Sequence, residues 1–295
     1  MTDVLRYAAF TTDPTAGNPA GVVLDAAGLS DEAMRSIAAE VGYSETAFLV
    51  PQAPDPDGDG DGDGDGDDPS YAVRYFSPEI EVPFCGHATI ATAVAIAERE
   101  GTGTLAFATK AGRILVETAH DADGRPTATL TSVATRVAPV ADDDLDEALA
   151  ALRWSPGDLD AGLPPRVAYA GAHHLVLATA TRSRLADLDY VFDALRDLML
   201  RRDWTTVTLV WRASELVFHV RNPFPVGGVV EDPATGAAAA ALGGYLRSLD
   251  LVTTPATLRL HQGEDMGRPG LLVVDVPADA DHVLVTGNAV VLLVP

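Results

Sequence analysis

The chain has 295 residues, of which 47% are hydrophobic, so it can bury two ordinary cores, and we expect two domains. Its formal net charge of -23 argues against binding to nucleic acid or to anionic membranes, because both need clustered Lys and Arg. The N-terminus lacks a basic region followed by an apolar stretch, and no apolar run reaches the roughly 20 residues of a membrane-spanning helix. We therefore expect a cytoplasmic protein.

The composition is unusually acidic. The carboxylates are mostly aspartate, and Lys110 is the only lysine. Such a surface is tolerated where salt screens self-repulsion, which indicates a halophilic organism with an acidic proteome. Drift in a GC-rich genome, which also favours Ala, Gly, Asp and Arg, is the alternative. Cys85 is the only cysteine, so the chain has no internal disulfide and no zinc site built on paired cysteines.

In the first half of the chain, strand patterns alternate with two helices. Ser30 can cap the first helix, whose apolar stripe runs from Met34 to Val41. The second helix, over residues 88–97, is apolar or small on every side, and such a helix has to be enclosed by other structure. The strands expected around it are 4–10, 22–24, a segment within 42–50, 71–76, 104–109, 112–118 and 127–132, with a turn over 17–21.

Residues 55–68 alternate Asp and Gly. This composition cannot bury apolar surface, so we expect a flexible surface loop that joins two strands. The beginning of this segment resembles a calcium-binding loop. The flanking amphipathic helices and the final glutamate are missing, so calcium is not expected there.

The same order of elements recurs in the second half. A second helix of small residues, 237–246, follows strands at 207–211 and 216–220, and further strands are expected at 257–261, 271–276 and 283–294. Aligning Gly86 with Gly236 therefore predicts a duplicated architecture with a cleft between the halves. The expected N-terminal lobe is 1–128 plus 282–295, and the C-terminal lobe is 129–281.

Each central helix begins at a turn that contains glycine, Cys85-Gly86-His87 in the first half and Thr235-Gly236-Ala237 in the second. Such a start presents unpaired backbone N–H groups and the positive end of the helix dipole. Two of them facing one cleft would bind a carboxylate. Glycine for close packing would equally explain either start by itself.

Three titratable side chains lie near these starts. Glu45 would be partly withdrawn from water, which suits a general base, although a salt bridge would also explain it. His87 is either a proton carrier or a capping or core group. Asp232 is a candidate for the same site, and capping of the second helix would suffice to explain it.

Two further features favour structural roles. A packed, inert thiol is the favoured interpretation of Cys85, because residues two apart seldom point at each other at a turn into a helix. The pair His173-His174 lacks further ligands at metal-binding spacing, so no metal site is expected there.

Five motifs, in register over most of the chain, resemble the PhzF-like family of phenazine biosynthesis. They are Gly17-Asn-Pro-Ala-Gly-Val22, Ser44-Glu-Thr-Ala-Phe48, Pro83-Phe-Cys-Gly-His-Ala-Thr89, Glu231-Asp-Pro-Ala-Thr-Gly236 and Gln262-Gly-Glu-Asp-Met-Gly-Arg-Pro269. The resemblance implies the diaminopimelate-epimerase-like fold. In this α+β fold, two pseudo-symmetric lobes each wrap a curled, mostly antiparallel, barrel-like sheet around a central buried helix.

The resemblance further implies an isomerase that moves a proton on a small carboxylate, without metal or organic cofactor. Glu45 matches the family's catalytic glutamate, and His87 and Asp232 would steer or relay protons. The family often forms two-fold dimers, so a homodimer is expected. The implied substrate contacts are Asn18, Cys85, Gly86, Thr235, Gly236 and Ala237.

One position departs from the family pattern. Many relatives carry a serine where this chain has Ala237. The lost hydroxyl leaves open a non-catalytic descendant that binds a metabolite or a partner protein. A hydrolase or transferase that uses the thiol of Cys85 is the third possibility.

Overall fold

The computed structural model describes residues 2–51 and 70–292, so the acidic segment expected as a surface loop lies outside the described residues. The chain forms two compact units. The first comprises the residues up to Thr131 and those from Thr286 onward, and the second is Ser132–Val285. The boundaries expected from the sequence lie after residues 128 and 281. Among the described residues, no helix is long and apolar enough to span a bilayer.

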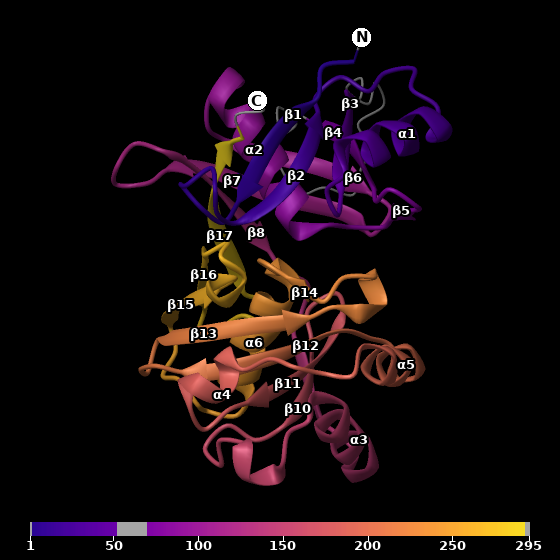
Figure 1. The fold of residues 1–295 in the computed structure, drawn as a ribbon. Helices are drawn as coiled ribbons and strands as arrows, with labels where there is room; N and C mark the ends of the chain where they lie inside the picture. Colours follow the sequence, from indigo (N-terminus) through magenta and orange to yellow (C-terminus); the bar gives the residue numbers. More distant parts are fainter. Residues whose placement is uncertain (1, 52–69, 293–295) are drawn as a thin grey trace. The chain divides into compact units, whose positions relative to one another are not determined.

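The strands of the first unit close into a barrel around a helix (Figure 1). The elements are β1 (Leu5–Ala9), β2 (Asn18–Val23), α1 (Asp31–Val41), β3 (Thr46–Pro51), β4 (Ser70–Phe76), β5 (Glu81–Val82), α2 (Gly86–Glu100), β6 (Thr104–Thr109), β7 (Gly112–His120), β8 (Pro126–Thr131) and β17 (Leu284–Val291). Strand pairing runs β1–β2–β3–β4–β6–β7–β8–β17 and returns from β17 to β1. The parallel pairs β2–β3 and β4–β6 need crossover connections, which contain α1 and α2.

The core of this barrel is α2. Every residue from His87 to Ala97 is buried, and most are alanine, threonine, isoleucine or valine. The helix contacts β1, β2, β3, β7 and β8, so strands surround it. The buried hydroxyl groups of Thr89 and Thr92 donate to the carbonyl oxygens of Cys85 and Ala88, each at 2.7 Å, and are thereby satisfied inside the core. The expectation that this helix is enclosed is confirmed.

The helix α1 lies against the barrel as its sequence pattern predicts. Ser30 Oγ accepts a hydrogen bond from the Ala33 amide at 3.2 Å, which confirms the expected cap. On the buried face, Met34 and Ala38 pack in one cluster with Phe48 and Phe76.

The predicted turn over residues 17–21 is wrong in part, because β2 already begins at Asn18. The chain reverses earlier, and Gly17 has φ +62°, where an added Cβ would lie 2.4 Å from the Ala9 carbonyl oxygen. Pro19 is tolerated within β2 because β3 pairs only with Gly21–Val23. The missing N–H group of Pro19 therefore costs no hydrogen bond to β3.

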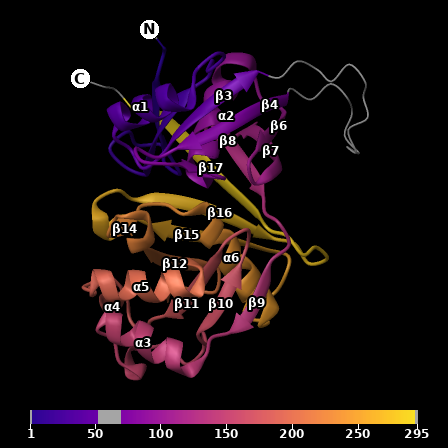
Figure 2. The same cartoon turned by 90° about the vertical axis from the view of Figure 1, so that its right-hand side faces the viewer.

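The second unit repeats this plan and adds helices to the outer face of its sheet (Figure 2). Its elements are β9 (Arg136–Pro139), α3 (Asp142–Leu152), β10 (Arg166–Tyr169), β11 (His173–Ala178), α4 (Arg182–Ala186), α5 (Phe192–Arg202), β12 (Trp204–Arg212), β13 (Val217–Pro223), β14 (Glu231–Asp232), α6 (Gly236–Ser248), β15 (Ala256–Gln262) and β16 (Gly270–Val276), with 3-10 turns at Pro156–Asp158, Pro225–Gly227 and Glu264–Met266. Pairing runs β9–β10–β11–β12–β13–β15–β16.

The duplication predicted from the two glycine-marked helix starts is confirmed by the topology. In the first unit, β4 pairs with the short β5, and the chain then passes through α2 to the parallel strand β6. In the second, β13 pairs with the short β14, and the chain passes through α6 to the parallel strand β15. The α+β, barrel-like fold expected from the sequence is therefore present.

The helix α6 approaches the wall of its sheet closely. It is buried along almost its whole length, from Gly236 to Leu246. A Cβ added to Gly244 would lie 2.4 Å from Thr135 Cβ, and one added to Gly243 would lie 2.9 Å from Val274 Cγ1. Glycine at these two positions therefore allows a packing distance that alanine would not.

The helices α3 and α5 were not anticipated from the sequence. Neither has a side-chain cap, since the residues before them are Ala141 and Val191, so the usual start signal is absent. Leucines on α3 and α5, among them Leu149 and Leu195, form one apolar cluster with Trp204 on β12. Tertiary packing thus stabilises helices that lack a local start signal.

A buried histidine lies on the inner side of this sheet. His174 Nδ1 lies 2.7 Å from Thr206 Oγ1, which in turn donates to Asn222 Oδ1 at 3.3 Å. Because the threonine proton is used on Asn222, Nδ1 of His174 carries the donated hydrogen. Among the described residues, His174 Nε2 has no hydrogen-bond partner. Burial lowers the pKa of His174 from its ordinary 6.5 to about 3, so the ring is neutral at pH 7.

We predict that His174 makes the protein less stable as the pH falls from 7 to 5. In the unfolded chain, the His174 imidazole binds a proton near pH 6.5, whereas in the folded chain it stays neutral down to much lower pH. The free energy of unfolding therefore falls with decreasing pH. One such proton contributes a slope of up to about 1.4 kcal/mol per pH unit. Urea unfolding at pH 7 and pH 5 measures it.

His174→Asn should be less stable at pH 7 but should lose this part of the pH dependence. His120→Asn, on the exposed end of β7, is the control and should behave as the unmodified protein. Equal slopes for His174→Asn and the unmodified protein would contradict the prediction.

Candidate active site

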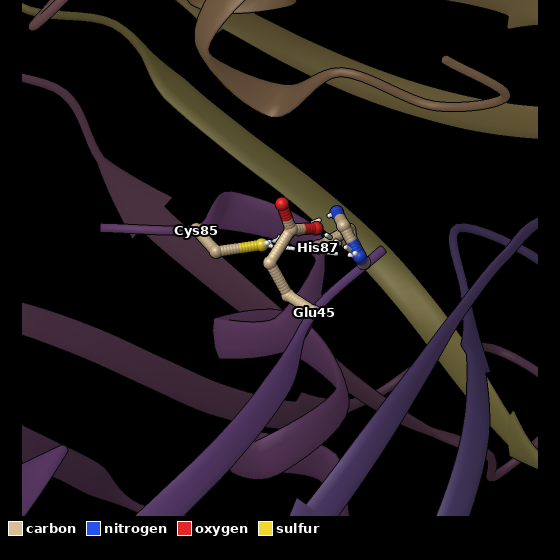
Figure 3. Close-up of side chains that lie close together, drawn as sticks. All are labelled: Glu45, Cys85 and His87. Atoms are coloured by element: carbon tan, nitrogen blue, oxygen red, sulfur yellow. Dashed lines mark hydrogen bonds and ion pairs between the residues drawn. The ribbon is translucent and has the colours of Figure 1, made fainter. Parts of the chain in front are cut away.

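Three side chains from distant parts of the sequence meet in the first unit (Figure 3). Glu45 immediately precedes β3, Cys85 is the N-cap residue of α2, and His87 is in the first turn of that helix. Glu45 Oε2 lies 3.5 Å from His87 Nε2 and 3.6 Å from Cys85 Sγ, and Cys85 Sγ lies 3.4 Å from His87 Nδ1. We call Glu45, Cys85 and His87 the acid–thiol–imidazole cluster.

The cluster is largely withdrawn from water. Cys85 and His87 are 8% and 6% exposed, whereas the Glu45 side chain is 16% exposed. Of the three groups, the carboxylate is therefore the one most open to a ligand.

The contact between Cys85 and His87 corrects one expectation. Residues two apart at a helix start were expected to point away from each other, yet the thiol and the imidazole touch. Cys85 has the extended backbone of an N-cap, with φ -145° and ψ 111°. A side chain at that position folds over the first helical turn, where His87 lies.

A buried chain of hydrogen bonds holds the Cys85 backbone. Thr89 Oγ1 donates to the Cys85 carbonyl at 2.7 Å, so Tyr75 must donate its hydroxyl proton to Thr89 Oγ1, at 2.6 Å. Burial raises the pKa of Tyr75, which keeps the phenol protonated as this role requires. The Cys85 carbonyl is therefore connected through Thr89 to a tyrosine in β4.

Two more polar residues of the first unit were considered for the site, Ser44 and Asn18. Ser44 Oγ lies 3.5 Å from His87 Nε2. Ser44 was not expected as a site residue, although it stands directly before Glu45 in the second motif. Asn18, expected as a substrate contact, is buried at the start of β2, where it pairs with Ala9.

The second unit carries a different polar network at the matching helix start. The Thr235 amide donates to Gln262 Oε1 at 3.1 Å, which identifies the other atom of the Gln262 side-chain amide as the donor Nε2. It donates to the Asp232 carbonyl at 2.7 Å and to Thr235 Oγ1 at 3.0 Å. Thr235 Oγ1 is left to donate its own proton to Asp232 Oδ2, at 2.5 Å. This order of donors makes Asp232 an acceptor.

Gln262 was missed as a site residue. It is 2% exposed and comes from the end of β15, far from Thr235 in the sequence. Gln262 is the first residue of the fifth motif, and this position could have indicated a role in the site. Asp232 accepts from Thr235, the N-cap residue of α6, so its carboxylate lies at this helix start.

Both helix starts present backbone N–H groups. The first intrahelical bonds run from the Thr89 amide to the Cys85 carbonyl and from the Ala239 amide to the Thr235 carbonyl. Neither helix has a side-chain cap. The amides of 86–88 and 236–238 therefore precede the helical ladder, as expected from the glycine turns.

A charged pair fixes the short strand before each helix. In the second unit, Arg221 Nε and Nη2 donate to the two carboxylate oxygens of Glu231 at 2.9 and 2.5 Å. In the first, Arg74 makes the same two-pronged contact with Glu81 at 2.8 and 2.7 Å. Bidentate pairs restrict orientation, so each pair helps to aim the turn that leads into α2 or α6.

The fold and these two helix starts can be compared with known proteins. A sequence model of the family described as phenazine biosynthesis-like proteins matches residues 7–294. This chain belongs to the PhzC–PhzF family.

Relatives of this PhzF-family chain support the assignment. An uncharacterized isomerase of Clostridium acetobutylicum is 31% identical, over 96% of this chain and 93% of the relative. The crystal structure of a PhzF-family phenazine biosynthesis protein from Bacillus anthracis superposes with a TM-score of 0.83 at 25% identity, covering 99% of this chain and 97% of the other. The chain is thus of the isomerase/epimerase class.

A more distant structure shows how widely the fold is shared. A probable proline racemase of Agrobacterium radiobacter has a TM-score of 0.67 at 12% identity, covering 98% of this chain and 91% of the other. At that identity the likeness concerns the fold alone.

We predict that Thr89→Val destabilises this PhzF-family protein more than Thr92→Val does. Both threonines are fully buried on α2 and donate to the carbonyl four residues earlier, but only Thr89 also accepts from a buried tyrosine. Loss of that acceptor leaves the Tyr75 hydroxyl unsatisfied, which costs about 1–3 kcal/mol. Urea unfolding of the two variants measures the difference, and equal stabilities would show that the Tyr75 bond contributes nothing.

Proposed function

We propose that this protein is an isomerase that moves a proton on a small carboxylate substrate without a cofactor, with Glu45 as the acid/base group. The class rests on its relatives, which are named isomerases. The observation that carries the residue assignment is the acid–thiol–imidazole cluster, in which a partly buried carboxylate lies 3.5 Å from an imidazole nitrogen. A positioned carboxylate can act as the general base of a proton shift, and the imidazole beside it offers a second proton carrier.

The chemistry follows from this arrangement. Glu45 takes a proton from a carbon of the substrate, and the electron pair left on that carbon is delocalised into the adjoining carboxylate or unsaturated system. The proton returns to a different carbon from Glu45, or from His87 after transfer across the 3.5 Å separation. Charge and atoms balance within one substrate, so no oxidant or co-reactant is needed.

The developing negative charge needs stabilisation. Backbone N–H groups at the first turn of α2, on 86–88, are directed out of the helix start and cost no reorganisation when the charge forms. By the family resemblance, the amides at the start of α6 would bind a carboxylate, and Asp232, held as an acceptor by Thr235, would receive or relay a proton.

Binding without catalysis is the second candidate, and Ala237 is the observation that favours it. Ala237 follows Gly236 in the first turn of α6 and has no hydroxyl to offer a ligand. Under this alternative, the protein binds a metabolite and Glu45 moves no proton.

The proposal is tested by hydrogen exchange at carbon. The protein is incubated with a panel of small cyclic and unsaturated carboxylates in deuterated water, and deuterium uptake is followed by NMR. At least one carboxylate should exchange with the unmodified protein. Glu45→Gln should lower the exchange rate by at least about 100-fold, the lower end of what a general base contributes.

Glu40→Gln provides the matched control. Glu40 lies on α1, five residues before the proposed base, and is exposed. The Glu40→Gln variant should catalyse hydrogen exchange in the same substrates at the rate of the unmodified protein. If a carboxylate binds, no carboxylate in the panel exchanges, and Glu45→Gln binds equally well, the isomerase proposal is wrong and the binding alternative is correct.

A further inference from the structure

The acid–thiol–imidazole cluster has a second chemical property besides proton transfer, because its three groups are also metal ligands. Among the described residues it is the only group of three or more His, Cys, Asp and Glu whose ligand atoms lie within 4.8 Å of one another. A thiolate and an imidazole together favour Zn²⁺ and similar soft or borderline cations. Mg²⁺ and Ca²⁺ prefer oxygen ligands.

The separations between the three groups fit one tetrahedral ion. With zinc bonds of about 2.3 Å to sulfur and about 2.0–2.2 Å to nitrogen and oxygen, the edges of a tetrahedron are roughly 3.3–3.6 Å long. The observed separations are 3.5 Å between Glu45 Oε2 and His87 Nε2, 3.6 Å between Glu45 Oε2 and Cys85 Sγ, and 3.8 Å between Cys85 Sγ and His87 Nε2. An ion therefore fits with side-chain adjustments of a few tenths of an ångström.

Burial and charge also suit a divalent cation. Cys85 and His87 are almost completely buried, and Glu45 opens one side to solvent, which leaves a fourth position for water. Metal binding would displace the thiol proton, and one divalent ion would then neutralise the thiolate of Cys85 and the carboxylate of Glu45.

We propose that Glu45, Cys85 and His87 bind one zinc ion per chain, with water as the fourth ligand, and that this ion inhibits the protein reversibly. The ion occupies the lone pairs with which Glu45 and His87 would carry protons. Inhibition therefore rests on the function proposed above, whereas binding of the ion does not.

Cobalt(II) is the probe for binding, because it replaces zinc and is coloured. The untagged full-length chain is titrated with Co²⁺ in excess Mg²⁺, which saturates exposed carboxylates without competing for sulfur. We expect one equivalent to give the intense visible bands of tetrahedral Co²⁺ and a near-ultraviolet sulfur-to-cobalt charge-transfer band. That band can come only from Cys85, because the chain has one cysteine. One equivalent of Zn²⁺ should remove both signals.

Variants identify the ligands. Cys85→Ala should abolish the charge-transfer band, and Glu45→Gln should weaken cobalt binding by at least about 10- to 100-fold, the cost of removing even an outer partner of a metal site. His173→Asn is the matched control, since His173 lies 3.4 Å from Asp203 in an exposed pair that could bind metal weakly. This variant should bind Co²⁺ as the unmodified protein does.

A second measurement uses only the unmodified protein, so a variant that fails to fold cannot affect it. Zn²⁺ in excess Mg²⁺ should slow alkylation of Cys85 by iodoacetamide at least tenfold in the unmodified protein, whereas Mg²⁺ alone should not. A weak octahedral cobalt spectrum without the charge-transfer band, or alkylation unaffected by Zn²⁺, overturns the proposed site.

The two proposals fail separately. If no carboxylate exchanges but the cobalt spectrum appears, the metal site is supported and the isomerase proposal is wrong. If exchange occurs and Zn²⁺ binds without slowing it, the inhibitory role falls.

Discussion

A helix without a polar side cannot lie at a protein surface, and this constraint organises both units. The helix α2 is buried from His87 to Ala97, and α6 is buried from Gly236 to Leu246. Each therefore requires a sheet that curls around it, and each sheet needs parallel crossovers to bring the helix inside. Small side chains, and glycine at 243 and 244, keep the walls close. Polar chemistry is then confined to the ends of the helices.

The polar groups gather at the first turn of each helix. Backbone amides at 86–88 and 236–238 precede the helical ladder, and no side chain caps either helix. The unit around α2 adds a carboxylate, a thiol and an imidazole in mutual contact. The unit around α6 adds Asp232 in a network with Thr235 and Gln262. Duplication therefore supplied two similar starts, and different side chains give them different chemistry.

Particular residues show how far the sequence could be interpreted. Ser30, the enclosure of residues 88–97 and the repeat of the strand–helix order were evident, because caps and hydrophobic patterns are local. The helices α3 and α5 were missed because packing against Trp204 and its neighbours stabilises them without a local start signal. Ser44 and Gln262 stood within recognised motifs, but nothing in the spacing tells that one approaches His87 and the other binds Thr235.

The sequence by itself determined the two buried helices, the glycine turns that begin them and the residue types available for chemistry, because these depend on side-chain size, polarity and backbone freedom within a few residues. Only the tertiary structure decided that Glu45 meets Cys85 and His87, since their contacts join residues forty or more positions apart. It also decided that the thiol faces the imidazole, because the extended backbone at Cys85 turns the side chain over the helix start. Proximity across the chain follows from how the sheet closes, which no local pattern records.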